Sequence, residues 1–444
     1  MRRAGPLGWL LSLWLLVLAC RPPEPAGVPL LDFGEDTPTN LLWLSVDTLR
    51  RDTVGRYAGT GDTPFVDGLL AQGVALDDHG GCSNWTAPSF HCLYTGARPL
   101  ELGFVVESGD DAVPGSPRRL DTLPEALAEA GFTGRLVTSN PYLEPSSSWP
   151  LGQGFETVSA KPFASGTVVT DAGLALAEGL TEPWFLQVHY LDPHEPYEAP
   201  EAFRDPAEPI AYDLNDPEQI RQLEADWFSL SDADKLAVQA WATAEYRAEV
   251  RSWDHELSRL WDGLDELGML DDTLVLVVSD HGQQHLERGR WAHGHHLHVE
   301  EAAALAGFWA PGLTPTVWSE PTTHQDLAVT LATLYGLSLP DATGLAVGEA
   351  PADRARTMFH FRLTDTGADG VPRHSVEADR WRLSYNWDGA LRLHDRLADP
   401  AEANDLIETA DPAEVDALWA LLAPDLAAAQ ALFPHLEAQG QWSR

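Results

Sequence analysis

Positive charge is scarce in this sequence, in which 28 lysine and arginine residues stand against 68 aspartate and glutamate residues and give a formal net charge of −40. A surface of this sign repels polyanions, which argues against nucleic acid or an anionic membrane face as a partner. An anionic small molecule would meet the same repulsion unless its site concentrated positive charge locally. Salt screens this field over about 8–10 Å, so such a local site is workable. A bound metal ion is the simplest source of that charge.

The hydrophobic run at the N-terminus is short. From Leu7 to Ala19 it would reach about 20 Å as a helix, while a bilayer core measures roughly 30 Å. Arg2 and Arg3 precede it, so residues 1–20 are predicted to be an export signal and not a membrane span.

The last residues of this segment predict where the protein resides. Val17-Leu18-Ala19-Cys20 resembles the lipobox of bacterial lipoproteins, in which Cys20 would be acylated and become the new N-terminus. Simple signal cleavage is the alternative. In both cases we expect an exported protein, in the periplasm or at the cell surface, and acylation of Cys20 would anchor it to the membrane.

Cysteine is rare, with three residues in the chain. Besides Cys20 they are Cys82 and Cys92, which bracket Thr86. In an oxidising compartment the two could form a disulfide, and a small buried thiol would explain Cys92 equally well.

Apolar runs that alternate with helical patterns predict an α/β fold. Residues 21–39 form a proline-rich linker, and residues 40–350 are expected to form a domain with a central, mostly parallel sheet flanked by helices. Beyond residue 351 a small C-terminal α+β subdomain is expected, ending at residue 444. The predicted strands are 41–46, 134–138, 183–188, 273–278, 381–385 and 391–394, and the predicted helices are 122–131, 231–268 and 412–432.

Thr86 precedes a predicted helix that has Pro88 in its first turn and Gly96 at its exit. The free N–H groups and the positive dipole end of such a helix suit a phosphate or sulfate ester that the Thr86 hydroxyl could attack. Taken alone, the pattern is more typical of an ordinary N-cap threonine, and the catalytic interpretation depends on other residues of the chain.

Asp47 and Asp280 each come directly off an apolar strand, where a buried carboxylate is costly unless it is paired or bound to a cation. His281 adds a nitrogen ligand and Thr86 a further oxygen. This set predicts a divalent metal site suited to Ca²⁺, Mg²⁺ or Mn²⁺, with Zn²⁺ also compatible. Each aspartate taken singly could instead be a helix cap or a turn residue.

Two segments concentrate histidine. Segment 189–197 holds His189 and His194 in a loop stiffened by proline, and segment 291–298 holds His293 and His295 among further histidines. Imidazole groups titrate near neutral pH and are therefore candidates for proton transfer. A structural turn and a weak surface metal-binding tract are the respective alternatives.

In this order the segments resemble the sulfatase branch of the alkaline phosphatase superfamily. The likeness covers nearly all of the sequence after the linker, and it comprises segments 40–50, 63–67, 85–96, 189–197, 246–254, 279–282, 293–295, 326–331 and 399–406. It implies the sulfatase fold and an ester hydrolase that requires a divalent metal.

The resemblance also implies roles for single residues. Asp47, Asp280 and His281 would bind the metal together with Thr86, which would be the nucleophile. His194 or His293 would protonate the leaving group. The remaining expected contacts to an anionic ester substrate are Asn140, His189 and His295, and Arg50 and Arg51 would add positive charge.

Two departures from the family pattern bear on the substrate. Sulfatases carry Cys or Ser at the Thr86 position, which is converted to formylglycine, and Arg where this sequence has Phe90. Threonine cannot become formylglycine. We therefore expect phosphoester hydrolysis, or transfer of a phospho group, with formylglycine-independent sulfate ester hydrolysis and a catalytically silent binding lipoprotein as the alternatives.

Overall fold

The computed structural model describes residues 30–34, 37–102, 121–144, 150–360, 373–386 and 389–432. The predicted signal segment 1–20 with Cys20 lies outside these residues, as does most of the predicted linker 21–39. Among the described helices, none combines the length and the apolar composition that a bilayer span requires.

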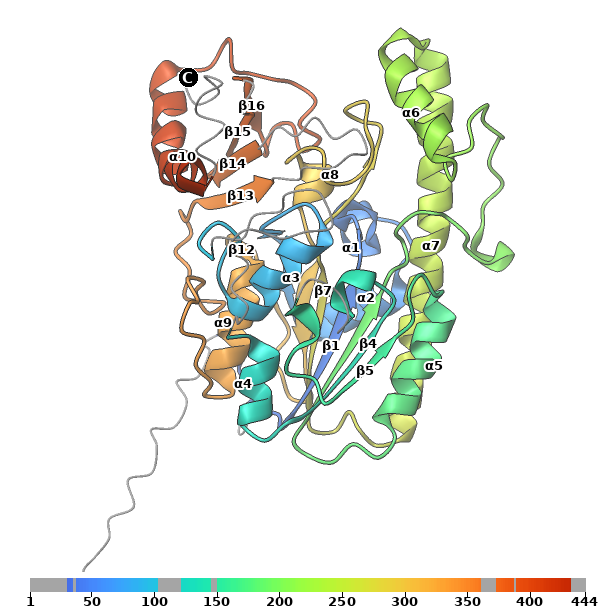
Figure 1. Cartoon of the computed structure of the whole chain (residues 1–444), viewed down its shortest axis with the longest axis vertical. Coiled ribbons are helices and arrows are strands. Elements are labelled where there is room, and N and C mark those ends of the chain that lie inside the picture. Colours follow the sequence, from blue (N-terminus) through green and yellow to red (C-terminus); the bar gives the residue numbers. More distant parts are fainter. Residues whose placement is uncertain are drawn as a thin grey trace, which may run out of the picture.

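An eight-stranded sheet occupies the centre of the molecule (Figure 1), in the order β11-β2-β10-β7-β1-β6-β4-β5. Strand β10 runs antiparallel to both of its neighbours, and the other strands run in one direction. The expected mostly parallel sheet is thus confirmed. Its strands are β1 (Asn40–Val46), β2 (Val74–Leu76), β4 (Thr133–Thr138), β5 (Thr157–Ala160), β6 (Trp184–Tyr190), β7 (Thr273–Ser279), β10 (Ala306–Trp309) and β11 (Thr316–Trp318).

Strand β1 shows why the central strands read as continuous apolar runs. All of its residues are buried. Leu42 and Leu44 join the apolar cluster on one face of the sheet, whereas Leu41 and Trp43 join the cluster on the opposite face. A parallel strand that is covered on both faces needs an apolar residue at nearly every position.

Helices cover both faces of the sheet, as Figure 1 shows. One group packs into the first cluster: α2 (Pro64–Gln72), α5 (Gly166–Ala177) and the long α7 (Asp232–Glu266). The second group packs into the other cluster: α3 (Thr86–Thr95), α4 (Leu123–Glu129) and α9 (His324–Leu334).

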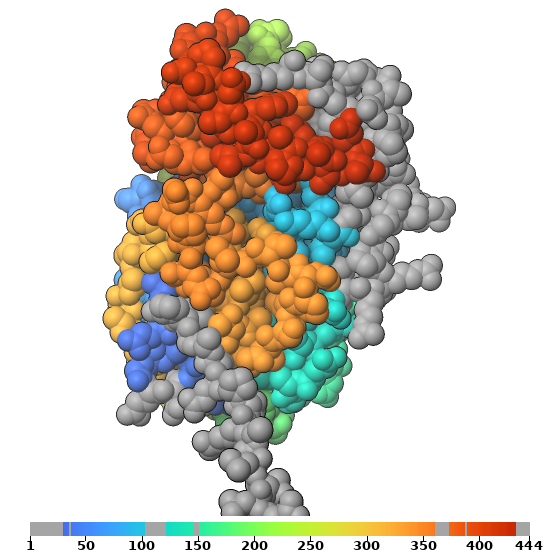
Figure 2. Space-filling view, turned by 90° about the vertical axis from the view of Figure 1, so that its left-hand side faces the viewer, coloured from blue at the N-terminus to red at the C-terminus, as the bar shows by residue number. Residues whose placement is uncertain are grey.

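The C-terminal residues form an antiparallel sheet covered by one helix, with a separate core that includes Leu383, Leu393 and Leu422. Figure 2 shows these red residues seated directly on the orange and light-blue residues of the larger domain. Arg98, which follows α3, forms an ion pair with Asp425 across this boundary at 2.6 Å. The elements are β13 (Arg356–His360), β14 (Arg373–Ala378), β15 (Trp381–Asn386), β16 (Leu391–Asp395) and α10 (Pro412–Leu432).

Short elements lie in the connections between these strands and helices. Strand β3 pairs with β12, and β8 pairs with β9 in a hairpin. These elements are α1 (Gly55–Ala58), β3 (His79–Gly80), α6 (Pro217–Asp226), β8 (Gln284–His285), β9 (Trp291–Ala292), α8 (Val299–Ala302) and β12 (Thr322–Thr323), with single 3-10 turns at Arg51–Thr53, Pro141–Leu143, Pro150–Gly152, Glu201–Phe203 and Trp227–Ser229.

Candidate active site

Asp47 and Asp280 meet because β1 and β7 are adjacent parallel strands. Val46, the last residue of β1, is in register with Ser279, the last residue of β7. The next residues, Asp47 and Asp280, therefore leave the sheet side by side at its carboxyl edge, where open α/β sheets bind ligands. Both carboxylates and the adjacent His281 have no exposed surface.

Among the described residues, three buried atoms of this group have no hydrogen-bond partner: Asp47 Oδ1, Asp280 Oδ2 and His281 Nε2. His281 Nε2 lies 3.7 Å from Asp47 Oδ1 and 3.4 Å from Asp280 Oδ2. Leaving such atoms unpaired is costly. Two carboxylate oxygens and an imidazole nitrogen, placed within 4.8 Å of one another, fit a divalent cation.

Asp280 Oδ1 and His281 Nδ1 have hydrogen-bond partners, and these hydrogen bonds orient the two side chains so that Asp280 Oδ2 and His281 Nε2 face each other. Asp280 Oδ1 accepts from the backbone N–H groups of Thr48 at 3.1 Å and His281 at 2.8 Å. His281 Nδ1 lies 2.8 Å from the carbonyl oxygen of Gly282. A proton on Nδ1 would donate to that carbonyl and leave the Nε2 lone pair facing the carboxylates, as in histidines that bind metals.

The electrostatics of the group reflect two carboxylates in one buried space. Burial raises the pKa of Asp47, but hydrogen bonding to His189 and the nearby charges of His194 and His281 prevail and lower it to about 2. Burial and the charge of Asp47 raise the pKa of Asp280 well above its usual range. Burial lowers the pKa of His281 to about 4, so its imidazole is neutral near pH 7. Neutral imidazole is the form that binds metals.

Thr86 is the first residue of α3, and its hydroxyl faces this group. The N-cap position belongs to Trp85 and makes no side-chain cap. Thr86 Oγ1 donates to Asp47 Oδ2 at 3.3 Å and accepts from Asn140 Nδ2 at 3.3 Å. The alternative in which Thr86 is an ordinary N-cap is therefore wrong. Pro88 occupies the first turn, where a missing N–H costs no helical hydrogen bond.

Asn140 and His189 lie against Asp47. Asn140 follows β4, and its Nδ2 donates to Asp47 Oδ2 at 2.5 Å. His189 is fully buried in β6, with Nδ1 at 3.1 Å from Ser45 Oγ and Nε2 at 3.6 Å from Asp47 Oδ2. Asn140 thus holds the Asp47 carboxylate by a hydrogen bond, and His189 lies next to it. The expected contact of both residues with substrate stays a prediction.

Phe90 explains part of that arrangement. Its side chain is fully buried in α3, and its ring meets the His189 ring edge to face at a centroid distance of 4.9 Å. The ring therefore fills the core beneath Asp47 and fixes the imidazole of His189. Sulfatases carry an arginine at this position, and in this protein an arginine would have to bury its charge in the space that the Phe90 ring fills. Phenylalanine therefore fits this packed site.

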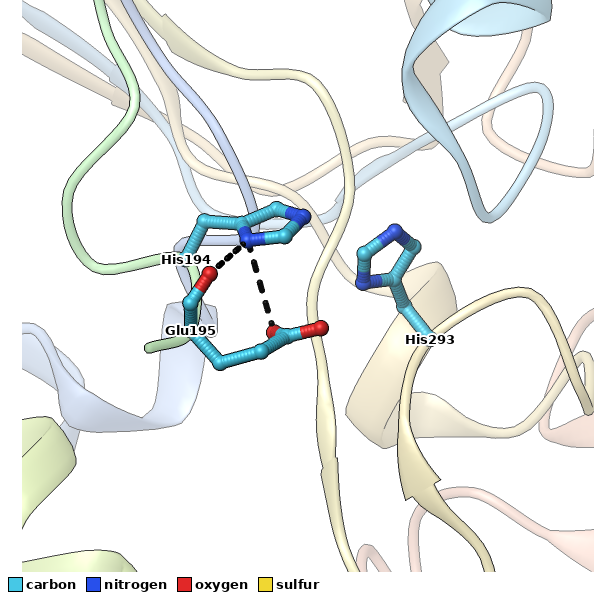
Figure 3. A group of neighbouring side chains, drawn as sticks. All are labelled: His194, Glu195 and His293. Atoms are coloured by element: carbon cyan, nitrogen blue, oxygen red, sulfur yellow. Dashed lines mark hydrogen bonds and ion pairs between the residues drawn. The ribbon is translucent and has the colours of Figure 1, made fainter. Parts of the chain in front are cut away.

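His194 and His293 lie beside this group, and Figure 3 shows their rings close to each other and to the Glu195 side chain. The His293 ring lies 4.6 Å from the His281 ring and 5.0 Å from the His194 ring, measured between centroids. His194 Nδ1 is fixed by the carbonyl oxygen of Glu195 at 2.5 Å. Both histidines are partly exposed, as groups that exchange protons with a substrate must be.

Arg50 and Arg51 do not supply the positive charge expected of them. Arg50 forms ion pairs with Asp52 at 2.8 Å and Glu287 at 2.5 Å. Arg51 Nη1 donates to the carbonyl oxygen of Asp77 at 2.9 Å. The two carboxylates offset the charge of Arg50, and Arg51 keeps its charge but is held at the backbone carbonyl of Asp77. A metal ion is therefore the better source of positive charge at the site.

Two glutamates of the site were not predicted from the sequence. The Glu195 side chain faces His194 and His293, and one donor atom from each of the three lies within 4.8 Å of the others. Glu301 is fully buried, and its carboxylate accepts from the N–H groups of Gly294 at 2.8 Å and His296 at 3.1 Å. Glu195 could have been predicted as a site residue, because it directly follows His194 in the sequence. No spacing in the sequence indicated that Glu301 belongs to the site.

Glu301 joins the turn that carries His293 to the turn that carries Thr86. It accepts from the His295 N–H at 3.2 Å and from Asn84 Nδ2 at 2.7 Å, and it also accepts from the side chain of Gln284. These donors account for the place of His295, whose side-chain contact with substrate stays a prediction. Burial raises the pKa of Glu301 to about 8.

Above pH 8, where Glu301 is a carboxylate, replacing it with glutamine should lower kcat by about 10- to 100-fold, because an amide NH₂ would face donors that need an acceptor and the His293 turn would shift. Metal content should stay unchanged. Steady-state kinetics with elemental analysis would check both. Glu300→Gln is the matched control, since Glu300 is the adjacent residue on α8 and pairs with Arg288 at 3.0 Å. Equal kcat values for the two variants would contradict this role.

Cys82 and Cys92 form a disulfide, which decides between the two alternatives left open for Cys92. Their Cα atoms are 6.7 Å apart, and the bond closes a loop over a sequence separation of 10. Thr86 lies inside this loop, so the crosslink ties the strand-to-helix turn of the nucleophile candidate to the body of α3.

Removing the crosslink with Cys82→Ala and Cys92→Ala together should lower the free energy of unfolding by about 2–4 kcal/mol, because the unfolded chain regains loop entropy. Urea unfolding followed by circular dichroism would measure it. A Ser/Ser double variant serves as a comparison, since it also buries two hydroxyl groups. Unchanged unfolding of the alanine variant would show that the crosslink contributes nothing to stability.

Comparison with known proteins agrees with this fold. Residues 39–337 match the family model described as Sulfatase. A choline-sulfatase of Rhizobium meliloti (strain 1021) is 30% identical over 245 residues, which span 51% of this chain and 46% of that protein. The chain thus matches about half the length of that relative.

Two solved structures share the fold. BT4656, in complex with its substrate D-glucosamine-2-N,6-O-disulfate, has a TM-score of 0.68 at 17% identity, over 90% of this chain and 99% of that one. The phosphonate monoester hydrolase SpPMH from Silicibacter pomeroyi has a TM-score of 0.66 at 21% identity, over 88% of this chain and 95% of that one. With the family model matching more than half of the sequence, the chain belongs to the sulfatase family of ester hydrolases, within the alkaline phosphatase superfamily.

Proposed function

We propose that this chain is an exported, metal-dependent hydrolase that attacks a phosphoester with Thr86. The observation that carries the proposal is the Thr86 hydroxyl at the N-terminus of α3, hydrogen-bonded to Asp47 and Asn140 beside an unpartnered group of metal-ligand atoms. A hydroxyl in this place can act as a nucleophile without modification. Threonine cannot be converted to formylglycine, so release of the product must proceed by hydrolysis or transfer of a threonine ester.

Sulfatase-family enzymes generally use a divalent metal ion, and this chain has residues to hold one. Asp47, Asp280 and His281 would be its ligands, with Thr86 alongside. The oxygen-rich set favours Ca²⁺, Mg²⁺ or Mn²⁺ and is compatible with Zn²⁺. When bound, the cation would lower the pKa of the Thr86 hydroxyl and neutralise charge on the transferred group.

The chain's own groups account for the remaining steps. Thr86 gives its hydroxyl proton to Asp47 Oδ2, the acceptor of its hydrogen bond, and its Oγ1 forms a bond to phosphorus while the bond to the leaving oxygen breaks. His194 or His293 gives that leaving oxygen a proton. N–H groups of the first turn of α3 and the helix dipole stabilise negative charge on the transferred group. Water then attacks phosphorus and gives a proton to that histidine, while the ester to Thr86 breaks and Thr86 Oγ1 takes its proton back from Asp47. An alcohol in place of water would make the same reaction a transfer.

The relatives support both phosphorus and sulfur esters as substrates. SpPMH is named as a phosphonate monoester hydrolase, and the choline-sulfatase and BT4656 are described with sulfated compounds. The threonine at position 86 favours phosphorus, because the sulfate route of the family depends on formylglycine.

A substrate panel tests the proposal. The purified protein would be assayed with aryl sulfates, phosphate monoesters, phosphodiesters and phosphonate monoesters in the presence of Ca²⁺, Mn²⁺ or Zn²⁺. Turnover of a phosphorus ester that depends on Thr86 supports it. Turnover restricted to sulfate esters would replace it with formylglycine-independent sulfate chemistry. A protein that binds no metal and turns over nothing would be a silent binding lipoprotein.

Export and anchoring through Cys20 are part of the proposal. The disulfide between Cys82 and Cys92 supports an oxidising compartment, since such bonds persist outside the cytoplasm. Mass spectrometry of the mature N-terminus, with the protein isolated from membranes, should find an acylated Cys20. An unmodified N-terminus elsewhere in the first residues would instead indicate simple signal cleavage.

A further inference from the structure

A second group of metal-ligand side chains lies where the C-terminal subdomain meets the main domain. It consists of His298, His394 and Glu402, which are 5%, 2% and 1% exposed. One donor atom from each lies within 4.8 Å of the others. His298 precedes α8 in the main domain, His394 belongs to β16 and Glu402 follows β16, so the group joins separate segments and shares no residue with the Thr86 site.

The contacts leave a ring nitrogen unused. His298 Nδ1 lies 2.8 Å from Glu402 Oε2, and the rings of His298 and His394 are 4.9 Å apart between centroids. Nδ1 of His394 is buried and has no hydrogen-bond partner among the described residues. A proton shared by His298 and Glu402 would explain their short distance, but it would leave His394 unpaired in the interior.

Glu402 is held firmly in this position. Arg382 Nε forms an ion pair with Glu402 Oε1 at 2.7 Å, and the Glu402 carbonyl oxygen accepts from Arg288 at 2.8 Å. Its backbone adopts a φ of 49°, a left-handed conformation that is uncommon for a residue with a side chain and is often found at functional sites. Arg382 engages Oε1, whereas Oε2 faces His298 and also accepts from the Val299 N–H at 3.3 Å.

The protonation states suit ligation. Burial lowers the pKa of His298 to about 4, and burial also lowers the pKa of His394. Burial raises the pKa of Glu402, but Arg382 and the hydrogen bond to His298 prevail and lower it to about 2. Near pH 7 the group therefore offers two neutral imidazoles and one carboxylate, which is the form in which these side chains bind metals.

We propose that His298, His394 and Glu402 bind a Zn²⁺ ion that ties the C-terminal subdomain to the main domain, with a water molecule as its fourth ligand. Two nitrogens and one oxygen are a donor set that suits Zn²⁺ and is poor for Ca²⁺ or Mg²⁺, which prefer oxygen alone. The ion would use the idle nitrogen of His394 and take the place of the proton between His298 and Glu402.

At this location the ion would hold segment 293–298 against the C-terminal subdomain. His298 ends the segment that begins at His293, and Glu301 already holds the middle of that segment through the N–H groups of Gly294, His295 and His296. Zinc at His298 would fix the far end of the segment to β16. The proposal does not depend on the reaction at Thr86, because it concerns separate ligands.

Zinc counting in four proteins tests the proposal: the parent, Asp280→Asn, His394→Ala and the combined variant. Each is equilibrated with ZnCl₂, passed through a desalting column and analysed for zinc. We expect His394→Ala to lose about one equivalent per chain relative to the parent, and the combined variant to lose the same amount relative to Asp280→Asn. His255→Ala, which changes an exposed histidine on α7, should keep the parent's count.

The count separates this proposal from the proposed function. An Asp280→Asn protein that holds zinc, lost on adding His394→Ala, supports the second site whether or not the enzyme is active. A His394→Ala protein with the same zinc content as the parent overturns it. The melting temperature gives a second readout, since EDTA should lower Tm in Asp280→Asn and leave Tm unchanged in the combined variant.

A measurement on the unaltered chain covers the case in which His394→Ala does not fold. Crystals of the parent protein grown with Zn²⁺ would be measured at the zinc absorption edge. An anomalous peak enclosed by His298, His394 and Glu402 supports the site. The lack of a peak there, in crystals that show one at Asp47 and Asp280, overturns it.

Discussion

Replacing Thr86 with alanine should reduce turnover of any ester substrate by about 10⁴-fold or more, because the hydroxyl is the only atom of that residue placed to attack and loss of a nucleophile has effects of this size. The fold should be unaffected. Thr86 is buried at the start of α3, and its side chain is not the N-cap of that helix, so alanine removes no cap. Single-turnover and steady-state kinetics with the best substrate of the panel would measure the loss.

Thr86→Ser is the matched control, since it keeps the oxygen and removes only a methyl group. It should retain much more activity than Thr86→Ala, with the same metal content in both proteins. A covalent adduct on residue 86, trapped by acid quench and located by mass spectrometry, should appear in the parent and in the serine variant. Equal activity of the alanine and serine variants would show that Thr86 is not the nucleophile.

The second large effect is expected at the metal group. Asp280→Asn should remove the bound divalent ion and reduce turnover by about 10³-fold or more, because the chain loses a charged ligand and the charge stabilisation that the ion supplies. Elemental analysis and kinetics at increasing metal concentration would measure both effects. Asp254→Asn is the control: Asp254 is equally buried but accepts from the backbone of Phe65 and Val66, away from the ligand atoms.

Asp280→Asn should lower activity but should not lower the stability of the metal-free protein. Burial and the charge of Asp47 raise the pKa of Asp280, so without metal the folded chain must either protonate Asp280 or bury two like charges. Asparagine avoids both costs. In EDTA at pH 7, Asp280→Asn should therefore resist urea at least as well as the parent while remaining inactive. A less stable variant would show that Asp280 stabilises the fold even without a cation.

Several features could be predicted because they are written into short stretches of sequence. The apolar runs of β1 and β7 predicted buried parallel strands, since such strands need apolar residues on both faces. Thr122 and Glu125 at the start of α4 form the reciprocal hydrogen bonds of a capping box, a signal that lies within four consecutive residues. The 35-residue helix α7 was predicted because its signal is also local: a long segment in which polar and apolar residues alternate.

Other features depend on contacts between distant segments. The backbone N–H of Thr48 donates to the Asp280 carboxylate across a sequence separation of 232, and no local sequence pattern predicts such a pair. Likewise Glu301 looks like a surface helix residue until the turns that contain Asn84 and Gly294 close around it. Arg50 was expected to supply positive charge at the site, but in the folded protein it forms ion pairs with Asp52 and Glu287.

The sequence by itself determined the family, the α/β order of strands and helices and the identity of the chemical groups, because these depend on residue types and their local spacing. Only the tertiary structure decided that Thr86 faces Asp47 instead of capping its helix, that Cys82 and Cys92 pair, and that His298 meets His394 and Glu402. Each of these outcomes is a direction or a distance between side chains. Directions and distances are set by the packing of the whole sheet and its helices, which no single stretch of residues contains.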